Sequence, residues 1–195
     1  MKAYYEARAR EYDDWWLGRN LYAARDRPGW FEEVAALLGT IASLPAARTL
    51  DVACGTGFLT RHLHGDVVGL DQSETMLEVA AEQAPNARLV GGDALSLPFE
   101  DGSFDRLFTS HFYGHLEPGD RELFLAEARR VAREIVLVDA SRVHAAAEEE
   151  WQPRVLNDGS RWQVYKRYFT PDRLLEELGG GDTLLAGTWF VVVRS

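Results

Sequence analysis

Cysteine and long hydrophobic runs are almost absent from this chain, and basic residues are in the minority. Cys54 is the only cysteine among 195 residues, so no intrachain disulfide can form, and we expect a reducing compartment, the cytoplasm. No apolar run approaches the length of a membrane span, and we expect neither a signal peptide nor a membrane partner. The net charge of −10 argues against a nucleic-acid partner, because proteins that bind nucleic acids usually present a basic face.

No CxxC pair is present, and we expect no metal site. The composition, with 46% hydrophobic and 27% charged residues, is that of an ordinary globular protein. A chain of 195 residues fits one domain, and no repeat or linker divides it, so we expect a single domain over residues 1–195.

A pattern of short apolar run, turn and helix repeats through the middle of the chain. The apolar runs predict strands at 49–53, 67–70, 88–90, 106–110 and 135–138. Helices are expected at 2–26, 30–41, 58–64, 73–84 and 118–132. Continuous apolar strands that alternate with helices indicate a parallel sheet covered on both faces.

The C-terminal third has a different pattern. Residues 145–151 read as a helix, and 157–159 (Asn-Asp-Gly) as a turn. Thr170 begins another helix, which the glycines at 179–181 end. Two β-rich runs, at 183–185 and 190–193, predict an antiparallel end to the sheet. We therefore predict a seven-stranded α/β sheet whose last strand pair is antiparallel.

Residues 49–57, Thr-Leu-Asp-Val-Ala-Cys-Gly-Thr-Gly, are the most informative stretch of the chain. An apolar strand ends in two glycines, which let a ligand approach the backbone closely. The helix expected next would offer unpaired N–H groups to a carboxylate or phosphate. A nucleotide or a similar ligand is the first hypothesis.

Two carboxylates follow at the ends of the next strands. Asp71 can accept hydrogen bonds from the ribose hydroxyls of a nucleoside, and Asp93, followed by Ala94 and Leu95, lies where an adenine ring would reach. A dinucleotide fold prefers a third small residue where this chain has Thr60. A phosphate-free cofactor, S-adenosylmethionine, therefore suits this loop better than NAD does.

At four places the chain resembles the class I S-adenosylmethionine-dependent methyltransferases, in particular the small-molecule branch that includes quinone-biosynthesis-like (type 11-like) enzymes. These places are LDVACGTG (50–57), VVGLDQSETML (67–77), GGDALSLPFEDGSFD (91–105) and RLFTSHFYGHL (106–116). The resemblance implies a Rossmann-like three-layer sandwich and methyl transfer from S-adenosylmethionine, with S-adenosylhomocysteine as product.

The family pattern implies a role for each residue of the cofactor site. Asp71 would hold the ribose and Asp93 the adenine amino group, and Ser110 would lie near the sulfonium. The glycines would face the methionyl part, and Asp51 would support their loop. Gln72 and Met76 would flank the adenosine, and Leu95 would pack on the ring. The full set is Tyr5, Tyr12, Asp51, Gly55, Gly57, Asp71, Gln72, Met76, Asp93, Ala94, Leu95 and Ser110. The alternative for Met76 and Leu95 is that they are ordinary core residues. The alternative for Asp51 is that it only stabilises the turn.

The loop after the fourth strand departs from the relatives that methylate bases. Those enzymes carry Asn/Asp-Pro-Pro-aromatic where this chain has Thr-Ser-His-Phe at 109–112, which disfavours base methylation. His111 and His115 are candidate general bases, since histidine titrates near neutral pH. A structural, hydrogen-bonded histidine is the alternative for each.

Two segments are expected to cover the site: a helical cap at 1–45 and a substrate-covering segment at 141–170. Tyr5 and Tyr12 are seven residues apart and share a helix face, so their hydroxyls either meet the methionyl carboxylate or pack on the sheet. In the second segment, aromatic and polar side chains suit an apolar or aromatic acceptor, although an ordinary covering helix is the alternative. The candidate substrate-binding residues are His111, Trp162, Tyr165 and Arg167.

The sequence therefore predicts a cytoplasmic methyltransferase, monomeric or homodimeric, that acts on a small-molecule acceptor. The methyl group would move by in-line displacement, in which positioning contributes much of the catalysis. An NAD-dependent oxidoreductase and a non-catalytic S-adenosylmethionine-binding protein are the alternatives.

Overall fold

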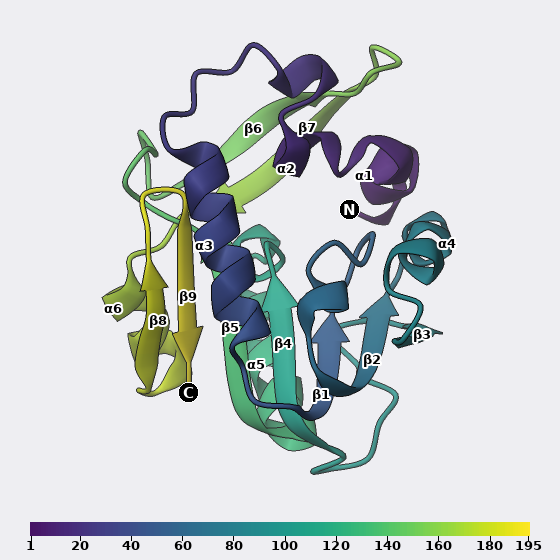
Figure 1. Ribbon diagram of the computed structural model, residues 1–195. Helices are drawn as coiled ribbons and strands as arrows, with labels where there is room; N and C mark the ends of the chain where they lie inside the picture. The colour runs from purple at the N-terminus through teal and green to yellow at the C-terminus, as the bar shows by residue number, and fades with distance from the viewer.

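A computed structural model describes residues 1–195 (Figure 1). Its main sheet contains strands β1 Ala47–Val52, β2 Gly65–Asp71, β3 Arg88–Gly91, β4 Phe104–Ser110, β5 Ala132–Ala140, β8 Asp182–Ala186 and β9 Phe190–Arg194. Their order is β3-β2-β1-β4-β5-β9-β8. The first five strands pair in parallel, and β9 is antiparallel to both of its neighbours. The predicted seven-stranded sheet with an antiparallel C-terminal strand pair is confirmed.

Helices cover both faces of this sheet: α3 Trp30–Ala42, α4 Glu74–Gln83, α5 Pro118–Val131 and α6 Pro171–Leu178. Figure 1 shows α3 in front of the sheet, with α5 and α6 behind it. Consecutive residues of β5 point to opposite faces, so Val136 and Val138 join the core under α3, whereas Ile135 and Leu137 join the core under α5. Burial on both faces explains why the strands are continuously apolar.

The helix ends follow the expected local chemistry. The Ser73 hydroxyl accepts the N–H of Met76 at 3.1 Å and caps α4. The Thr170 hydroxyl caps α6 in the same way, and Gly179 ends it in the left-handed conformation at φ +85°. These three termini lie where the sequence predicts them.

The helix predicted at 58–64 is absent. Only a 3₁₀ turn, η3 Thr60–His62, lies between the glycine loop and β2. Tertiary contacts override the local helical spacing here, because Phe58 and Leu59 are buried and the Thr60 hydroxyl donates to Asp51 at 2.6 Å. The glycine loop therefore has no α-helix N-terminus behind it, and the helix expected to supply an anion site is absent.

The single helix predicted at 2–26 is broken into four short pieces. They are α1 Lys2–Arg8, η1 Ala9–Glu11, α2 Asp14–Leu17 and η2 Asn20–Tyr22. Gly18, at φ +62°, ends α2. Trp15 and Trp16 turn inward against Trp30 and Phe190 instead of following one helix face. Tertiary packing of these aromatic rings overrides local helix propensity here.

The helix predicted at 145–151 is also wrong. Residues 149–155 form strand β6 Glu149–Val155, which pairs with β7 Arg161–Arg167 as a separate antiparallel hairpin. The predicted turn at 157–159 connects the two strands. Pro153 cannot continue a helix, and Trp151 lies opposite Tyr165, a favourable cross-strand aromatic pair.

The part of the first covering segment that precedes α3 lies above the carboxyl ends of the parallel strands, as does the β6–β7 hairpin of the second (Figure 1). Figure 1 shows α1, α2 and the β6–β7 hairpin together beyond the arrowheads of β1, β2 and β4. In parallel α/β sheets this edge is where ligands bind. None of the helices is long and apolar enough to cross a membrane.

Candidate functional site

A cavity of about 300 Å³ lies at the carboxyl edge of the sheet. The loops after four neighbouring strands and the N-terminal segment line it. Most of the predicted cofactor residues meet there: Tyr5, Tyr12, Gly55, Asp71, Gln72, Met76, Asp93, Ala94, Leu95 and Ser110. His111 and His115 also line this cavity.

Asp71 holds the glycine loop in place as well as lining the cavity. Its two carboxylate oxygens accept the N–H groups of Gly55 and Ser73, each at 2.9 Å. Burial raises the pKa of Asp71, and these hydrogen bonds act in the opposite direction. Gly55 lies at φ +54°, a conformation that favours glycine and brings its N–H toward the carboxylate.

Asp51 and Gly57 lie outside this cavity. The Asp51 carboxylate accepts the Thr60 hydroxyl at 2.6 Å, and burial raises the pKa of Asp51 to about 7. Thr60, the residue that disfavours a dinucleotide, therefore stabilises the glycine loop through its hydrogen bond to Asp51. A side chain at Gly57 would meet Ala80 and Ala84 at 3.2–3.3 Å, so this glycine lets the loop approach α4 closely. Both residues shape the loop.

The adenine end of the cavity is formed by Asp93 and two apolar side chains. The Asp93 carboxylate accepts the N–H of Leu95 at 2.9 Å and fixes the turn after β3. Met76 is buried against the core, and Leu95 packs at its edge. Acidic groups after β2 and β3 with apolar walls between them fit a ribose and an adenine ring. The residues present therefore fit an adenosyl cofactor.

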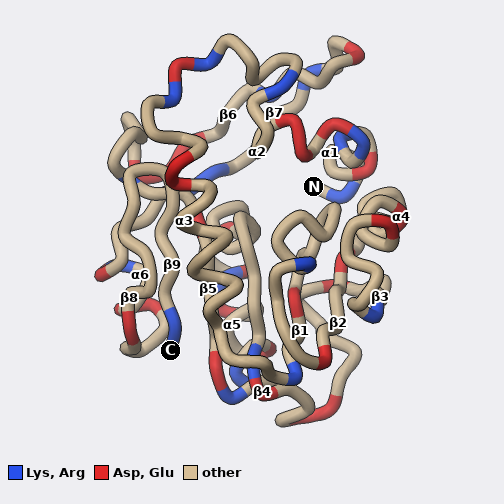
Figure 2. The backbone as a smooth tube through the Cα atoms, viewed as in Figure 1, with Lys and Arg blue, Asp and Glu red and all other residues tan.

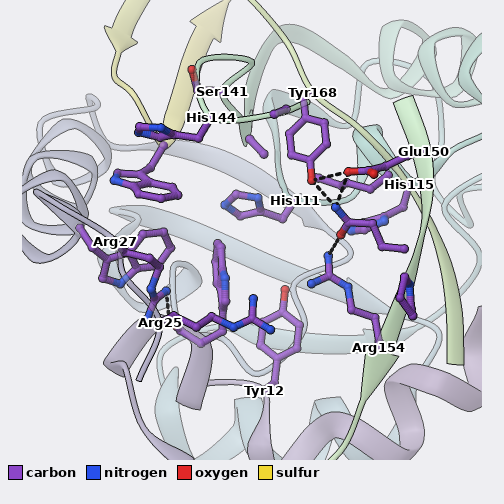
Figure 3. Close-up of a pocket in the computed structure, with 18 of the residues that line it drawn as sticks. Tyr12, Arg25, Arg27, His111, His115, Ser141, His144, Glu150, Arg154 and Tyr168 are labelled. Atoms are coloured by element: carbon purple, nitrogen blue, oxygen red, sulfur yellow. Dashed lines mark hydrogen bonds between the residues drawn. The ribbon is translucent and has the colours of Figure 1, made fainter. Parts of the chain in front are cut away.

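A second cavity, of about 650 Å³, adjoins the first. Both cavities are lined by Tyr5, Tyr12, His111 and His115, so they meet at these four side chains. The larger cavity extends to the end of β5, the loop before α3 and the β6–β7 hairpin (Figure 3). Its walls come from both covering segments.

His111 lies at this junction in an unusual backbone conformation, with φ +51°. Its Nδ1 is 3.9 Å from Asp139 Oδ1, and its buried Nε2 has no hydrogen-bond partner. Burial and then the charge of Lys166 lower the pKa of His111 to about 3, so the ring is neutral at pH 7. The nearby carboxylate favours the proton on Nδ1, which leaves Nε2 as an acceptor.

His115 presents the same tautomer. Its Nδ1 lies 2.6 Å from the Tyr165 carbonyl oxygen, which can only accept, so Nδ1 carries the proton. Burial and the charge of Lys166 hold the pKa of His115 well below its usual value. The sequence-based expectation that these histidines titrate near neutral pH is not met, because burial first and the positive charge of Lys166 second lower both pKa values.

Three predicted substrate residues do not line either cavity. The Trp162 ring packs on Tyr4, the Tyr165 hydroxyl donates to Glu149, and Arg167 forms ion pairs with Glu148 and Glu177. Tyr165 and Arg167 alternate along β7 with Lys166, which lines the larger cavity, so they face away from it. Trp162 shares the face of Lys166 but belongs to a small apolar cluster farther along.

Sequence reasoning missed the arginines of the larger cavity: Arg8, Arg25, Arg27 and Arg154. Only one of them lies in a regular strand. Recognition of β6 would have placed Arg154 on the face of Glu150 and Gln152, because every second residue of a strand shares a face. The other three come from the broken N-terminal segment, which has no periodic signal.

Residues 50–136 match the family model described as a methyltransferase domain. A demethylmenaquinone methyltransferase of Staphylococcus haemolyticus (strain JCSC1435) is 43% identical over 96 residues, which cover 45% of this chain and 39% of that protein. The match thus spans about two fifths of the relative's length.

Solved structures resemble the whole chain. A structure titled as a DhpI–SAM–HEP complex has a TM-score of 0.75 and 25% identity, with 98% of this chain and 94% of that chain covered. The glycopeptide N-methyltransferase MtfA shares the fold, with a TM-score of 0.62, 20% identity, and coverage of 83% and 88%. The fold is therefore the Rossmann-like fold found in methyltransferases.

Proposed function

We propose that this protein transfers a methyl group from S-adenosylmethionine to a small-molecule acceptor, and the match of residues 50–136 to the methyltransferase-domain model supports this. The observation that carries the proposal is the junction of the two cavities at Tyr5, Tyr12, His111 and His115. The smaller cavity has the nucleoside-binding side chains, and the larger one has room for an acceptor beside it.

The chain's own residues would hold the cofactor in the smaller cavity. Asp71 would bind the ribose hydroxyls, Asp93 the adenine amino group, and Met76 and Leu95 the faces of the ring. When bound, S-adenosylmethionine supplies a methyl group activated by a sulfonium. Ser110 and the two tyrosines line the part of the cavity that leads to the junction.

At the junction, the protein would orient the acceptor and exclude water. Neutral His111 and His115 each present an unprotonated Nε2, which can accept a hydrogen bond from an acceptor hydroxyl or amine. Such a bond fixes the direction of the acceptor's lone pair. We assign both histidines this positioning role, since their lowered pKa values make them weak bases.

We further propose one functional unit over residues 1–195, with 1–45 as the cap and 141–170 as the acceptor cover. The acidic net charge and the single cysteine support a cytoplasmic enzyme, monomeric or homodimeric, without nucleic-acid or membrane partners.

Calorimetry with S-adenosylhomocysteine tests the cofactor assignment. We expect Asp71→Ala to weaken binding by about 100-fold or more, because it removes a charged acceptor and frees the N–H groups of Gly55 and Ser73. Asp66→Ala, an exposed carboxylate of the same strand, is the matched control and should bind like the parent. Equal affinity of Asp71→Ala and parent would refute the ribose assignment.

Transfer of labelled methyl to a small-molecule extract tests the activity. Label in a small product supports the proposal. Binding of S-adenosylhomocysteine without any transfer indicates a non-catalytic binding protein, whereas binding of NAD(H) in its place indicates an oxidoreductase.

A further inference from the structure

The larger cavity is basic, although the chain as a whole is acidic. Its lining includes five cationic side chains, those of Arg8, Arg25, Arg27, Arg154 and Lys166, and two carboxylates, those of Asp26 and Glu150. The whole chain, in contrast, has 31 acidic and 21 basic residues. Figure 2 shows that basic positions lie along the segment between α2 and α3, which borders this cavity.

Arg8 is a buried cation without a counterion. The residue is only 8% exposed, and its guanidinium donates to the hydroxyls of Tyr4 and Tyr22 at 2.9 and 3.1 Å. Its Nε has no hydrogen-bond partner, and no carboxylate lies within ion-pairing distance. A buried charge left unpaired is costly, so this position is suited to an anion that enters the cavity.

Arg154 approaches the same space from the hairpin. Its guanidinium donates to the side-chain oxygen of Gln152, whose amide in turn donates to Tyr168 and Glu150. In Figure 3 the Arg154 guanidinium points into the cavity, between Tyr12 and Tyr168. Gln152 is neutral, so the charge of Arg154 is also uncompensated.

Among the other cations of the cavity, Lys166 is neutralised by Asp139 at 2.5 Å and offers no free charge. Arg25 and Arg27 form no ion pair and stack on the rings of Tyr22 and Trp30, with the charged carbons 4.6 and 3.9 Å from the ring centroids. They lie together at another side of the cavity from Arg154 (Figure 3). Arg8 also lies over an aromatic ring, that of Tyr12 at 4.7 Å, but it is more buried than Arg25 and Arg27.

We propose that the larger cavity binds an acidic small molecule, and that Arg8 and Arg154 hold its carboxylate, phosphate or similar oxyanion. The occupant is the methyl acceptor if the proposed function holds. Guanidinium groups bind such oxyanions through paired, charge-assisted hydrogen bonds. An uncharged apolar acceptor would leave both arginines without a counterion, so the apolar acceptor expected from the aromatic residues of 141–170 is disfavoured.

Calorimetric titration with inorganic phosphate and with acetate tests this site, on the protein saturated with S-adenosylhomocysteine and on the protein alone. Glycerol is the uncharged probe. We expect the anions to bind and glycerol not to bind. Arg154→Gln and Arg8→Gln should each weaken phosphate binding by about tenfold or more. Arg161→Gln, an exposed arginine on the same hairpin that does not line the cavity, is the matched control and should bind phosphate like the parent.

Absence of anion binding to the parent overturns the proposal. An equal loss of phosphate affinity in Arg154→Gln and Arg161→Gln overturns it as well. Loss of S-adenosylhomocysteine affinity in Arg8→Gln also overturns it, because Arg8 would then serve the cofactor's carboxylate. Arg154 is half-buried, and its variant is informative even if Arg8→Gln fails to fold. A parent that takes phosphate through both arginines but binds no S-adenosylhomocysteine keeps the anion site and refutes only the methyltransferase assignment.

Discussion

His111, at the junction of the two cavities, has an unusual backbone conformation. A histidine at φ +51° is uncommon, and such strain persists only where the surroundings hold it. The His111 N–H donates to the Val138 carbonyl at 2.9 Å, and its ring packs against Trp15 and Trp16 at centroid distances of 5.0 and 5.3 Å. These contacts fix the ring, whose buried Nε2 has no hydrogen-bond partner.

We expect His111→Asn to lower kcat by about 10- to 100-fold, with little change in affinity for S-adenosylhomocysteine. Asparagine tolerates the left-handed conformation, so the backbone is preserved while the ring nitrogen is removed. Steady-state kinetics with the acceptor found by methyl labelling measures the effect, with His62→Asn, far from both cavities, as control. A purely structural role would instead lower stability and leave kcat at the parent value.

At the scale of elements, two carboxylates attach the cap to the cofactor side. Asp13 accepts the Thr56 hydroxyl and the Gln83 amide, each at 2.6 Å. Glu6 of α1 accepts the N–H groups of Glu74 and Thr75 at 3.0 and 3.2 Å, together with the Thr75 hydroxyl at 2.6 Å. These N–H groups begin α4, where unpaired donors and the helix dipole favour a negative charge. The contact holds Tyr5, and with it one wall of both cavities.

We expect Glu6→Gln to speed the dissociation of S-adenosylhomocysteine severalfold, because the neutral amide attaches α1 to α4 less firmly. Stopped-flow displacement measures the rate. Glu82→Gln, the same change at an exposed glutamate of α4, is the matched control. Identical rates for the two variants and the parent would show that the cap does not limit release.

At the scale of the whole molecule, stability depends on a buried acid beneath the glycine loop. The pKa of Asp51 is raised to about 7, chiefly by burial and also by Asp71. A carboxyl group whose pKa is raised by folding stabilises the fold most at low pH, and this stabilisation is lost as the pH rises toward the folded-state pKa. The Asp51 carboxyl therefore weakens the fold between about pH 4 and pH 7.

Asp51→Asn should remove this dependence while it keeps an oxygen for the Thr60 hydroxyl. The free energy of unfolding of Asp51→Asn minus that of the parent should be roughly 2 kcal/mol larger at pH 8.5 than at pH 5. Urea denaturation at the two pH values measures the difference. Asp66→Asn, on the exposed end of β2, should show no such gain. A difference between Asp51→Asn and parent that stays constant with pH would contradict the raised pKa.

Local sequence carries the information for most of the sheet and for the nucleoside-binding residues. Asp71 and Asp93 each follow an apolar strand, and parallel strands end at one edge, so their meeting at one cavity follows from local pattern. The segment 58–64 shows where local pattern fails, because its burial and the Thr60–Asp51 hydrogen bond override the helical spacing.

The sequence by itself determined the α/β architecture and the carboxylates of the cofactor cavity, since both depend on short-range periodicity and on where strands end. Only the tertiary structure decided the acceptor cavity. Arg8 and Arg154 are 146 positions apart, one in the short helix α1 and the other in strand β6, which the sequence did not predict. They line one space only after the two segments fold over the sheet. The physical reason is that pairing of β6 with β7 and packing of the cap are long-range interactions, which local propensity does not encode.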